Sequence, residues 1–583
     1  MAERILSPGV FSRENDLSFI TPAAGEISTA LVGPAAKGPV GIPTVVRSYG
    51  EYTNVFGGAF KSGSDYYSHF TTLAAEKYFE QGGSSLLVTR IAGASGNTFD
   101  SATATVYSAS NAWFTLKTVA QGFHTTNSGS ALAGSNNALI SGSADNVRWE
   151  VTSKNASQGT FSLVIRRGDD NEKNKIILES YPNLSLDPKS DNYIAKKIGD
   201  QYKTLNADST VTVNGDYPNV SKYVYVSNVA YKTPDYFGND GVAKATYSGS
   251  FDGFVIGSGS YHGAFEGGSG LLYQPAVTAN FFENINATDT QGLTAAMYTN
   301  INNTGASVAT LLANKDEYRF NVLLTPGLNK NQHSATVTAL TSMVESRGDA
   351  IYVADLYQYG GSVANITGAA GSMNSSYAAA YWPWVKLNSG ELGKNVWTPA
   401  STVMGGVYAF TDRVGAEWFA PAGLLRGGIP TVVMAERKLS QSDRDSLYLG
   451  KVNPLATFPG SGVVAYGQKT LQTKASALDR VNVRRLLINL KNFIGDQSNN
   501  LVFEQNTIAT RNRFLAAVNP YLETVVQRQG LYAYRVVMDD TNNTADVIDR
   551  NQLVGQIFIQ PTKTAEFIVL DFVVQPTGAT FGA

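Results

Sequence analysis

An apolar run close to the C-terminal end places the strongest constraint on how this chain folds. Residues 567–574 read FIVLDFVV. Alternate side chains of a strand point to opposite faces, and here both faces are apolar apart from Asp571. Such a strand needs neighbours on both faces, whereas chain ends usually fray. We therefore expect this run to be tied into a sheet, either of its own subunit or of another one.

Two more strand-like runs precede it, at residues 532–538 and 553–560. Both are rich in Val, Ile, Phe and Tyr, which suit a pleated, half-buried surface. A polar stretch full of Asp and Asn separates these two runs, and a Pro-containing link at residues 561–565 leads to the final run. The first two runs therefore predict a hairpin-like region near the C-terminal end.

The composition limits the kinds of partner and chemistry. Only 16% of the 583 residues are charged, the formal net charge is −2, and the chain has 56 Gly and 30 Tyr. Low charge with many Tyr and Gly suits large contact surfaces, and a near-neutral balance favours neither nucleic acid nor an anionic membrane as partner. The absence of Cys excludes disulfides, thiolate metal sites and a Cys nucleophile. Without a signal peptide or a run of about 18 apolar residues, we expect a soluble protein, made in a cytoplasm, with no membrane insertion.

The length predicts roughly three or four domains, and the sequence pattern suggests where they lie. Strands expected at residues 320–324 and 350–354 flank a helix expected at 335–347, which predicts a parallel strand–helix–strand unit. Residues 94–270 are instead rich in Gly, Ser, Asn and Thr, with short alternating runs. The predicted fold is α+β and multidomain. An interaction arm is expected at residues 1–20, an α/β core at 21–93 and 271–478, a β-rich insertion at 94–270, and a C-terminal α+β domain at 479–583.

The C-terminal domain is expected to begin with an amphipathic helix at residues 480–494. Asp479 is its expected N-cap and Gly495 its expected stop, and a second helix is expected at 506–518. Arg484, Arg485 and Lys491 form a basic patch on the first helix. This patch is either a solvated outer face or a contact surface for an acidic partner.

The motifs that suggest catalytic or cofactor sites fail on spacing or on missing residues. Residues 462–470 read GVVAYGQKT, but Gln468 breaks the phosphate-loop pattern, so a Gly-rich strand and turn is favoured. The four histidines are far apart and are expected to be ordinary surface or loop residues. The Asp-rich stretch at 539–549 lacks the Gly and terminal Glu of a calcium loop and is interpreted as a turn. We expect no catalytic, cofactor-binding or metal site, and interpret the chain as a non-enzyme.

Several short segments, spread in order along the chain, carry a family resemblance. They are LSPGV at residues 6–10, IRR at 165–167, NLS at 183–185, DNYI at 191–194, APAG at 420–423 with RG at 426–427, DRVNVRRL at 479–486, YRVV at 534–537, DTNNT at 540–544, VIDRN at 547–551 and FIQP at 558–561. Together they resemble the tail sheath proteins of contractile-tailed bacteriophages, the myovirus-type tail sheath family. The resemblance is densest from about residue 408 onward.

The resemblance implies a structural and mechanical function in the virion tail. Copies are expected to stack helically as hexameric rings around the tail tube protein, together with baseplate and tail terminator proteins, after assembly in the host cytoplasm. Contraction then drives the tube through the host envelope, without any cofactor. The insertion is expected to face outward, and Arg484, Arg485 and Lys491 to face the tube. The alternatives are a type VI secretion or bacteriocin-like sheath and, from another class, a hydrolase or nucleotide-binding enzyme with a polar pocket in its core.

Strand addition is the physical device that we expect to join the subunits of such a sheath. The N-terminal arm, around residues 5–11, and the C-terminal strand, around residues 567–574, are predicted to pair with a neighbour's sheet. The receiving sheet is predicted in the hairpin-like region at residues 532–538 and 553–560. The donor residues are Ile5, Leu6, Val10, Phe11, Phe567, Ile568, Val569, Leu570, Phe572 and Val573. The receiving residues are Tyr534, Val536, Val537, Ile557 and Ile559.

Overall fold

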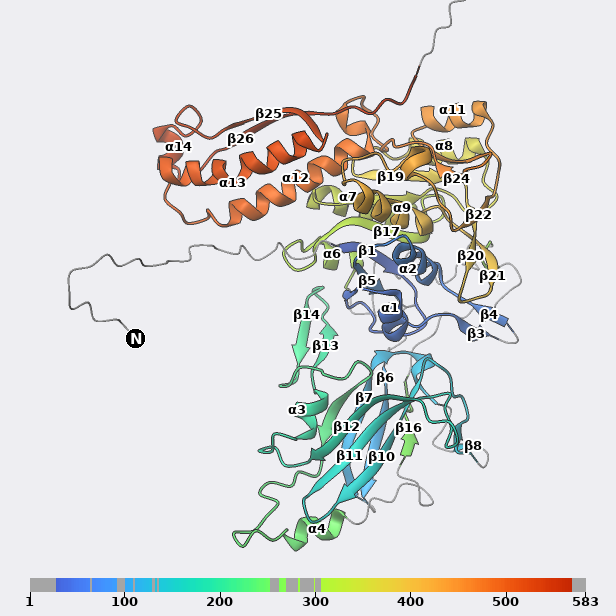
Figure 1. Cartoon of the computed structure of the whole chain (residues 1–583), viewed down its shortest axis with the longest axis vertical. Helices are drawn as coiled ribbons and strands as arrows, with labels where there is room; N and C mark the ends of the chain where they lie inside the picture. Colours follow the sequence, from blue (N-terminus) through green and yellow to red (C-terminus); the bar gives the residue numbers. More distant parts are fainter. Residues whose placement is uncertain are drawn as a thin grey trace, which may run out of the picture.

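The computed structural model describes residues 28–62, 65–91, 100–108, 111–127, 132–133, 136–251, 262–268, 281–283, 298 and 306–568. Figure 1 shows a central part, a β-rich part below it, and an elongated part of helices and strands at the upper left. We call them the core (residues 28–91 and 306–480), the insertion (100–268) and the C-terminal lobe (481–561). This mixed α/β, multidomain architecture agrees with the predicted fold class, whereas the predicted domain boundaries stay predictions.

The core is built on a sheet for which the described residues supply eight strands. Neighbours are parallel from β5 to β23, and β2 and β24 pair antiparallel at the two edges. The central strands are nearly continuous apolar runs because helices cover both faces of the sheet. In order across the sheet, the strands are β2 (Thr44–Val46), β5 (Leu86–Arg90), β1 (Ser28–Gly33), β17 (Phe320–Asn329), β18 (Ile351–Asp355), β19 (Ala378–Trp382), β23 (Asn453–Phe458) and β24 (Gly462–Ala465).

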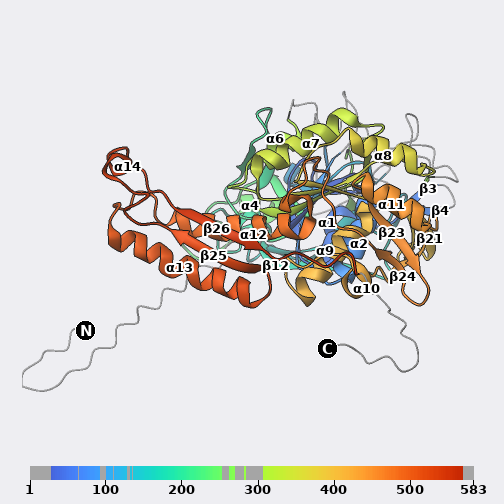
Figure 2. The same cartoon turned by 90° about the horizontal axis from the view of Figure 1, so that it is seen from above.

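Helices lie on both sides of this sheet (Figure 2). α2 (Phe70–Glu80) and α9 (Ser401–Val414) pack together on one side. α6 (Val308–Ala313), α7 (Ser334–Arg347) and α8 (Val363–Gly371) lie on the other. The predicted strand–helix–strand unit is confirmed, since β17, α7 and β18 follow one another and the two strands pair in parallel.

Smaller elements complete the core. The helix α11 begins at a capping box, in which Ser440 and Asp443 satisfy each other's backbone N–H groups. The others are α1 (Tyr49–Phe56), β3 (Phe60–Ser62), β4 (Asp65–Tyr67), β20 (Val385–Ser389), β21 (Lys394–Thr398), α10 (Gly423–Arg426), β22 (Val432–Ala435) and α11 itself (Gln441–Leu449).

The insertion is a sandwich of two antiparallel sheets. One sheet has the order β12 (Ile177–Ser185), β11 (Thr160–Arg167), β10 (Val147–Asn155), β16 (His262–Ala264), and the other β15 (Val224–Val229), β7 (Asn111–Gln121), β6 (Ser101–Ser108). Their inner faces share one apolar cluster, in which the rings of Phe114 and Phe161 stack with centroids 5.5 Å apart. Further elements are β8 (Leu132–Ala133), β9 (Ala138–Leu139), α3 (Ile194–Ile198), β13 (Tyr202–Leu205), β14 (Val211–Asn214) and α4 (Ala245–Phe251).

A buried arginine ties the insertion to the core. Arg90, at the end of β5, donates from Nε to the carbonyl of Ala35 at 3.1 Å. From Nη1 it donates to the carbonyls of Gly38 at 2.7 Å and Gln121 at 2.8 Å. Because Gln121 ends β7, one side chain joins the core loop to the root of the insertion.

The β13–β14 hairpin supplies another attachment. Its residues Leu205 and Val211 pack against the main hydrophobic cluster of the core. At its turn, the hydroxyl of Ser209 accepts a hydrogen bond from the backbone N–H of Ser307 at 3.3 Å. The insertion is therefore held to the core at well-separated points (Figure 1).

The C-terminal lobe packs a strand pair on a helix pair. Its elements are α12 (Val481–Asn499), α13 (Ile508–Gln527), β25 (Leu531–Val537), α14 (Ala545–Asp549) and β26 (Gln556–Pro561). Leu486, Leu490, Phe514, Val518 and Leu522 form the centre of its own apolar cluster. No helix in the described ranges is long and apolar enough to cross a membrane.

Both predicted ends of the first C-terminal helix are wrong. Asp479 closes a short 3-10 turn and pairs with Arg480 at 2.9 Å, and Arg480 occupies the N-cap position of α12 without a side-chain cap. The helix also continues through Gly495 to Asn499. A single glycine in a helix interior costs about 1 kcal/mol, and the stacking of Phe493 on Tyr521 of α13 favours continuation.

Candidate functional site

The predicted strand donors fall largely on undescribed parts of the chain. Ile5, Leu6, Val10 and Phe11 lie outside the described residues, and so do Val569, Leu570, Phe572 and Val573. Phe567 and Ile568 are described, and their side chains are 79% and 78% exposed. Their strand exchange with a neighbouring subunit stays a prediction.

The predicted receiving residues lie on β25 and β26, which pair antiparallel. Tyr534 lies opposite Ile559 and Val536 opposite Ile557, and all four pack against the helices of the lobe. The hydroxyl of Tyr534 also donates to the carbonyl of Asn519 in α13 at 3.1 Å. This face of the strand pair is thus fixed to the lobe and sets the position of its edges.

The other face and the edges of the pair are accessible. Val537 lies opposite Gln556 and Arg535 opposite Phe558, whose side chain is 56% exposed. Within the described residues β25 and β26 pair only with each other, so each strand has one edge without a strand partner there. Unpaired edges present backbone N–H and C=O groups to which another strand can add.

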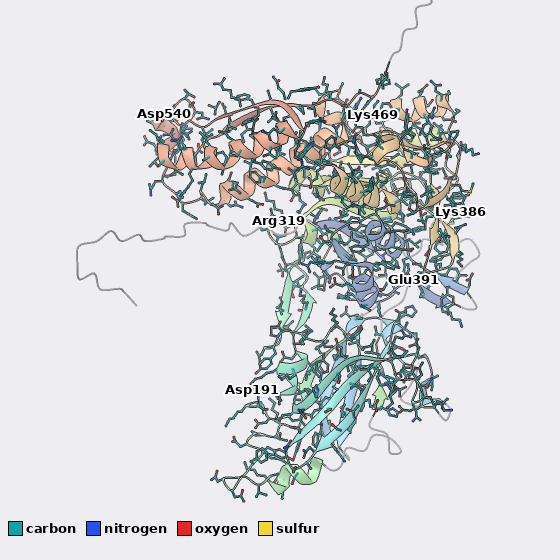
Figure 3. All side chains as sticks on the ribbon, in the orientation of Figure 1. Asp191, Arg319, Lys386, Glu391, Lys469 and Asp540 are labelled. Atoms are coloured by element: carbon teal, nitrogen blue, oxygen red, sulfur yellow. The ribbon has the colours of Figure 1, made fainter. Side chains whose placement is uncertain are left out.

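Asn543 holds the connection between the two strands. Its side-chain amide donates to the carbonyls of Asp539 at 3.1 Å and Val554 at 2.9 Å, and its oxygen accepts from the N–H of Val554 at 2.9 Å. The interpretation of this stretch as a turn rich in Asp and Asn is confirmed, although it also contains α14. Asp540, at the far end of the lobe in Figure 3, pairs with Arg511 at 2.8 Å. No group of three or more His, Cys, Asp or Glu in the described ranges is placed to hold a metal ion.

Two of the three basic residues expected to face the tube are buried inside the subunit. Arg485 forms a double hydrogen bond with the carboxylate of Asp412 in α9, at 2.8 and 2.6 Å, and lies over the ring of Tyr408. Burial lowers the pKa of Arg485, but Asp412 raises it further, so the net pKa is above its ordinary value.

Arg484 lies over the ring of Tyr377, 4.0 Å from its centroid, and donates to the hydroxyl of Ser376 at 2.5 Å. Lys491 is exposed, and its Nζ lies 3.1 Å from the hydroxyl of Tyr377. The reading of the patch as a solvated outer face is therefore wrong for Arg484 and Arg485, which are 4% and 2% exposed. Their role toward a tube stays a prediction, and Lys491 is the member of the set with free access.

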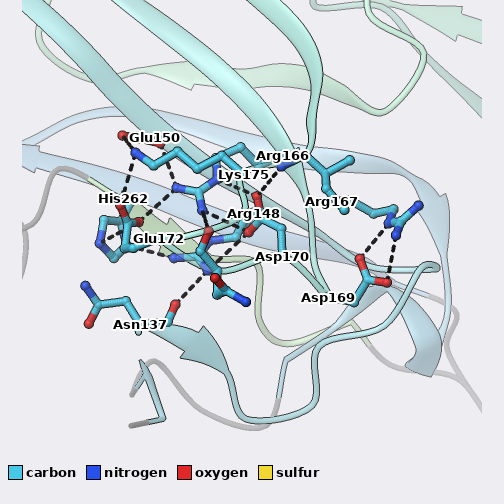
Figure 4. Close-up of polar contacts among 12 residues, drawn as sticks. Asn137, Arg148, Glu150, Arg166, Arg167, Asp169, Asp170, Glu172, Lys175 and His262 are labelled. Atoms are coloured by element: carbon cyan, nitrogen blue, oxygen red, sulfur yellow. Dashed lines mark hydrogen bonds and ion pairs between the residues drawn. The ribbon is translucent and has the colours of Figure 1, made fainter. Parts of the chain in front are cut away.

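A buried ionic cluster in the insertion was not expected from the sequence (Figure 4). Arg166 bonds the carboxylate of Asp170 from Nε at 2.7 Å and from Nη2 at 3.0 Å. Its Nη1 also bonds Glu150 at 2.7 Å and Glu172 at 3.0 Å. The cluster, which we call the insertion ionic cluster, consists of Arg148, Glu150, Arg166, Asp170, Glu172, Lys175 and His262. Since each carboxylate faces at least one cation, the arrangement favours structural pairing over metal binding.

The expectation of surface or loop positions holds only in part: His69 and His333 lie in loops but are buried, and His262 is buried in β16. His69, His262 and His333 are 1%, 7% and 7% exposed. Burial, with a further contribution from the nearby Arg90, lowers the pKa of His69 to about 3. His262 lies within hydrogen-bond distance of Arg148, with Nδ1 3.0 Å from Nη2. Burial also lowers the pKa of His262. The burial of these three histidines is not predictable, because the sequence does not reveal which segments turn inward.

The Gly-rich stretch at residues 462–470 forms a strand, β24, and a link. Lys469 (Figure 3) donates to the carbonyl of Tyr448 at 2.8 Å and lies 4.1 Å from the centroid of its ring. The predicted strand is confirmed, whereas an extended link follows it in place of the predicted turn. The lysine makes its contacts within the core.

Two segments of the chain, which contain most of the residues described above, match known protein families. Residues 291–471 match the family model described as "Phage tail sheath protein central domain", and residues 473–575 match "Phage tail sheath C-terminal domain". Over these two segments, the chain matches the models of the phage tail sheath family. The β25–β26 pair, α12 and the exposed Phe567 and Ile568 all lie in the segment that matches the C-terminal domain.

Individual relatives agree with this assignment. The tail sheath protein of Vibrio phage KVP40 is 42% identical over 188 residues, and that of Enterobacteria phage T4 is 42% identical over 187 residues. Each alignment covers 32% of this chain and 28% of the relative, so less than a third of either relative is matched. A crystal structure of a sheath tail protein from Listeria innocua covers 92% of this chain and 96% of its own, with 12% identity and a TM-score of 0.52, and shows a shared fold.

Proposed function

We propose that this chain is the structural subunit of a contractile phage tail sheath. Copies join as hexameric rings stacked helically around a tail tube, together with baseplate and tail terminator proteins, after assembly in the host cytoplasm. Contraction drives the tube through the host envelope. The energy for this step lies in the difference between two packings of one lattice, summed over many identical interfaces. The proposal therefore includes neither a cofactor nor a catalytic site.

The observation that carries the proposal is the β25–β26 pair with its open edges. One face is packed on α12 and α13, so the position of the edges is fixed within the subunit. The described chain then ends in exposed apolar residues, Phe567 and Ile568, which continue in the sequence as a run apolar on both faces. An apolar run and an open strand pair suit each other across a subunit boundary, because main-chain hydrogen bonds form on addition of a strand.

We propose one role for each of the domains predicted from the sequence. Residues 1–20 act as an interaction arm, and residues 21–93 and 271–478 form the core of the sheath wall. Residues 94–270 face outward, and residues 479–583 contact the tube and exchange strands. Within this last part, exposed Lys491 is the residue of the basic set that can meet an acidic tube surface without rearrangement of the subunit.

The second candidate function is a sheath of a type VI secretion or bacteriocin-like system, in which strand addition would join the subunits in the same way. The relatives named above are phage proteins, which favours the phage tail. Capsid genes beside the gene for this chain support the phage reading, and their absence from the locus contradicts it.

Overexpression followed by negative-stain electron microscopy tests the proposed function. The full chain is expected to form sheath-like tubes. A chain that ends at Ile568 is expected to stay folded without forming tubes, because it lacks residues 569–574, most of the apolar run. Asp571→Asn, which keeps the apolar run, is the matched control and is expected to assemble. Normal tubes from the truncated chain contradict strand donation by this run.

A further inference from the structure

Glu566 makes most of the polar contacts of residues 563–568, which follow β26. The carboxylate of Glu566 accepts hydrogen bonds from Arg480 at 2.7 Å (Nε to Oε1) and 3.0 Å (Nη2 to Oε2). It also accepts from the hydroxyl of Tyr448 at 2.6 Å and from the side-chain amide of Gln468 at 3.1 Å. Charge-assisted and bidentate bonds of this kind are among the strongest polar contacts in proteins. We call this group of four residues the arm anchor.

The partners of Glu566 come from separate elements. Tyr448 lies in α11, Gln468 follows β24, and Arg480 immediately precedes α12. Gln468 also donates to the hydroxyl of Thr564 at 2.6 Å, which adds a contact to the same segment. The anchor therefore attaches the segment to α11, to the link after β24 and to the residue that precedes α12, rather than to the β25–β26 pair.

Apolar packing contributes little to this attachment. Of residues 563–568, Glu566 is the one that is not exposed, and its side chain is 18% accessible. Burial raises the pKa of Glu566, but the bonds from Arg480, Tyr448 and Gln468 lower it more, so its net pKa lies below the usual value. The carboxylate is thus charged at neutral pH, and the ionic contact is the main one that fixes these residues.

We propose that Glu566 is a positioning residue that fixes the root of the strand-donating arm on the core of its own subunit. This inference rests on the proposed function. The donated strand then departs from the core of one subunit, whereas the sheet that receives it belongs to the C-terminal lobe of the next. A pull on the arm during contraction passes to Tyr448, Gln468 and Arg480, and β26 is not peeled from β25.

Anchoring also raises the efficiency of assembly. A segment that is already held in place loses less conformational freedom when the strand beyond it pairs with a neighbour. A freed root adds several residues that must be ordered at each new contact. Loss of the anchor is therefore expected to raise the protein concentration at which tubes appear, while the fold of the subunit stays intact.

The test compares Glu566→Ala with Lys563→Ala, a matched control at an exposed position of the same segment. A spin label on an added cysteine, Ala565→Cys, in this chain without Cys is expected to move at least twofold faster in the unassembled Glu566→Ala subunit and to be unchanged in the control. The critical concentration for tubes, measured by sedimentation and electron microscopy, is expected to rise at least tenfold in Glu566→Ala. The melting temperature is expected to stay within about 2 °C of that of the parent chain.

A charge-exchanged pair separates positioning from simple loss of a side chain. Arg480→Glu alone is expected to behave as Glu566→Ala, and the combination of Arg480→Glu with Glu566→Arg is expected to restore most of the assembly. Unchanged mobility of the label in Glu566→Ala overturns the anchor, and so does an unchanged critical concentration of this variant when the parent chain forms tubes. Failure of the parent chain to form tubes at all instead overturns the proposed function, and the anchor's role in assembly with it.

Discussion

Replacement of Asp170 by alanine removes the central carboxylate of the insertion ionic cluster. Asp170 has no accessible side-chain surface and accepts from Arg166 at 2.7 and 3.0 Å, from Arg148 at 3.4 Å and from the backbone N–H of Ile176 at 2.9 Å. Breaking a buried ion pair by removing one partner costs about 3–5 kcal/mol. Because Arg166 keeps its bonds to two glutamates, we place the loss at the lower end, at about 3 kcal/mol.

The neighbouring residue provides a matched control. Asp169 pairs with Arg167 at 2.5 Å, but the two side chains are 35% and 38% exposed (Figure 4). Exposed pairs contribute about 0–1 kcal/mol, so Asp169→Ala is expected to have a small effect. The two variants remove the same chemical group at adjacent positions, and they differ in burial.

Hydrogen-exchange mass spectrometry of the full chain measures the local effect. A loss of about 3 kcal/mol corresponds to roughly 100-fold faster exchange of the slowest amides in β10 and β11, since each 1.4 kcal/mol is a factor of ten. Asp169→Ala is expected to change this exchange less than about fivefold. Equal exchange rates in the two variants refute the view that the buried cluster stabilises the sandwich.

Three other predictions concern the core and the C-terminal lobe. Burial raises the pKa of Asp355 to about 6, above the value of about 3.9 in an unfolded chain; its contribution to stability is therefore complete below about pH 4 and lost as the pH rises to about 6. In urea unfolding, the free energy of unfolding of Asp355→Asn is expected to rise by about 2–3 kcal/mol relative to that of the parent chain between pH 4 and pH 7. A difference between the two proteins that does not change with pH contradicts the raised pKa. Leu522→Ala, at a fully buried position of the lobe, is expected to lose about 2–5 kcal/mol, whereas Val502→Ala at a 60% exposed position is expected to lose less than about 0.5 kcal/mol; similar losses count against the described packing. Lys491→Glu is expected to reduce sheath formation on purified tube without lowering the melting temperature, and Lys474→Glu, an exposed charge reversal outside α12, to leave it unchanged; equal assembly of both variants removes Lys491 from the tube contact.

Local patterns predicted much of the secondary structure. The expected helix at residues 335–347 and strand at 350–354 correspond to α7 (Ser334–Arg347) and β18 (Ile351–Asp355). The run at 532–538 corresponds to β25 (Leu531–Val537). Hydrophobic periodicity and turn residues are local signals, so they predict an element correctly wherever contacts with other elements do not change its structure.

The wrong predictions concern residues whose contact partners are distant in the sequence. Nothing near Arg485 indicates that Asp412, 73 residues earlier, receives its guanidinium, and a basic residue on a helix is usually solvated. In the same way, β26 begins at Gln556 rather than at residue 553 because Asn543 holds the backbone of Val554 in the turn. The role of Glu566 depends on three elements that meet only in the folded chain.

The attachment of the insertion through Arg90 and through the β13–β14 hairpin has a practical consequence. A body held at separate points cannot swivel about a single joint, so it shares every rotation of the surface to which it is fixed. A fluorophore or gold particle on the end of this sandwich far from the core therefore reports the rotation of the core itself. In the proposed sheath, such markers on successive copies offer a direct readout of how far, and in what order, the subunits reorient.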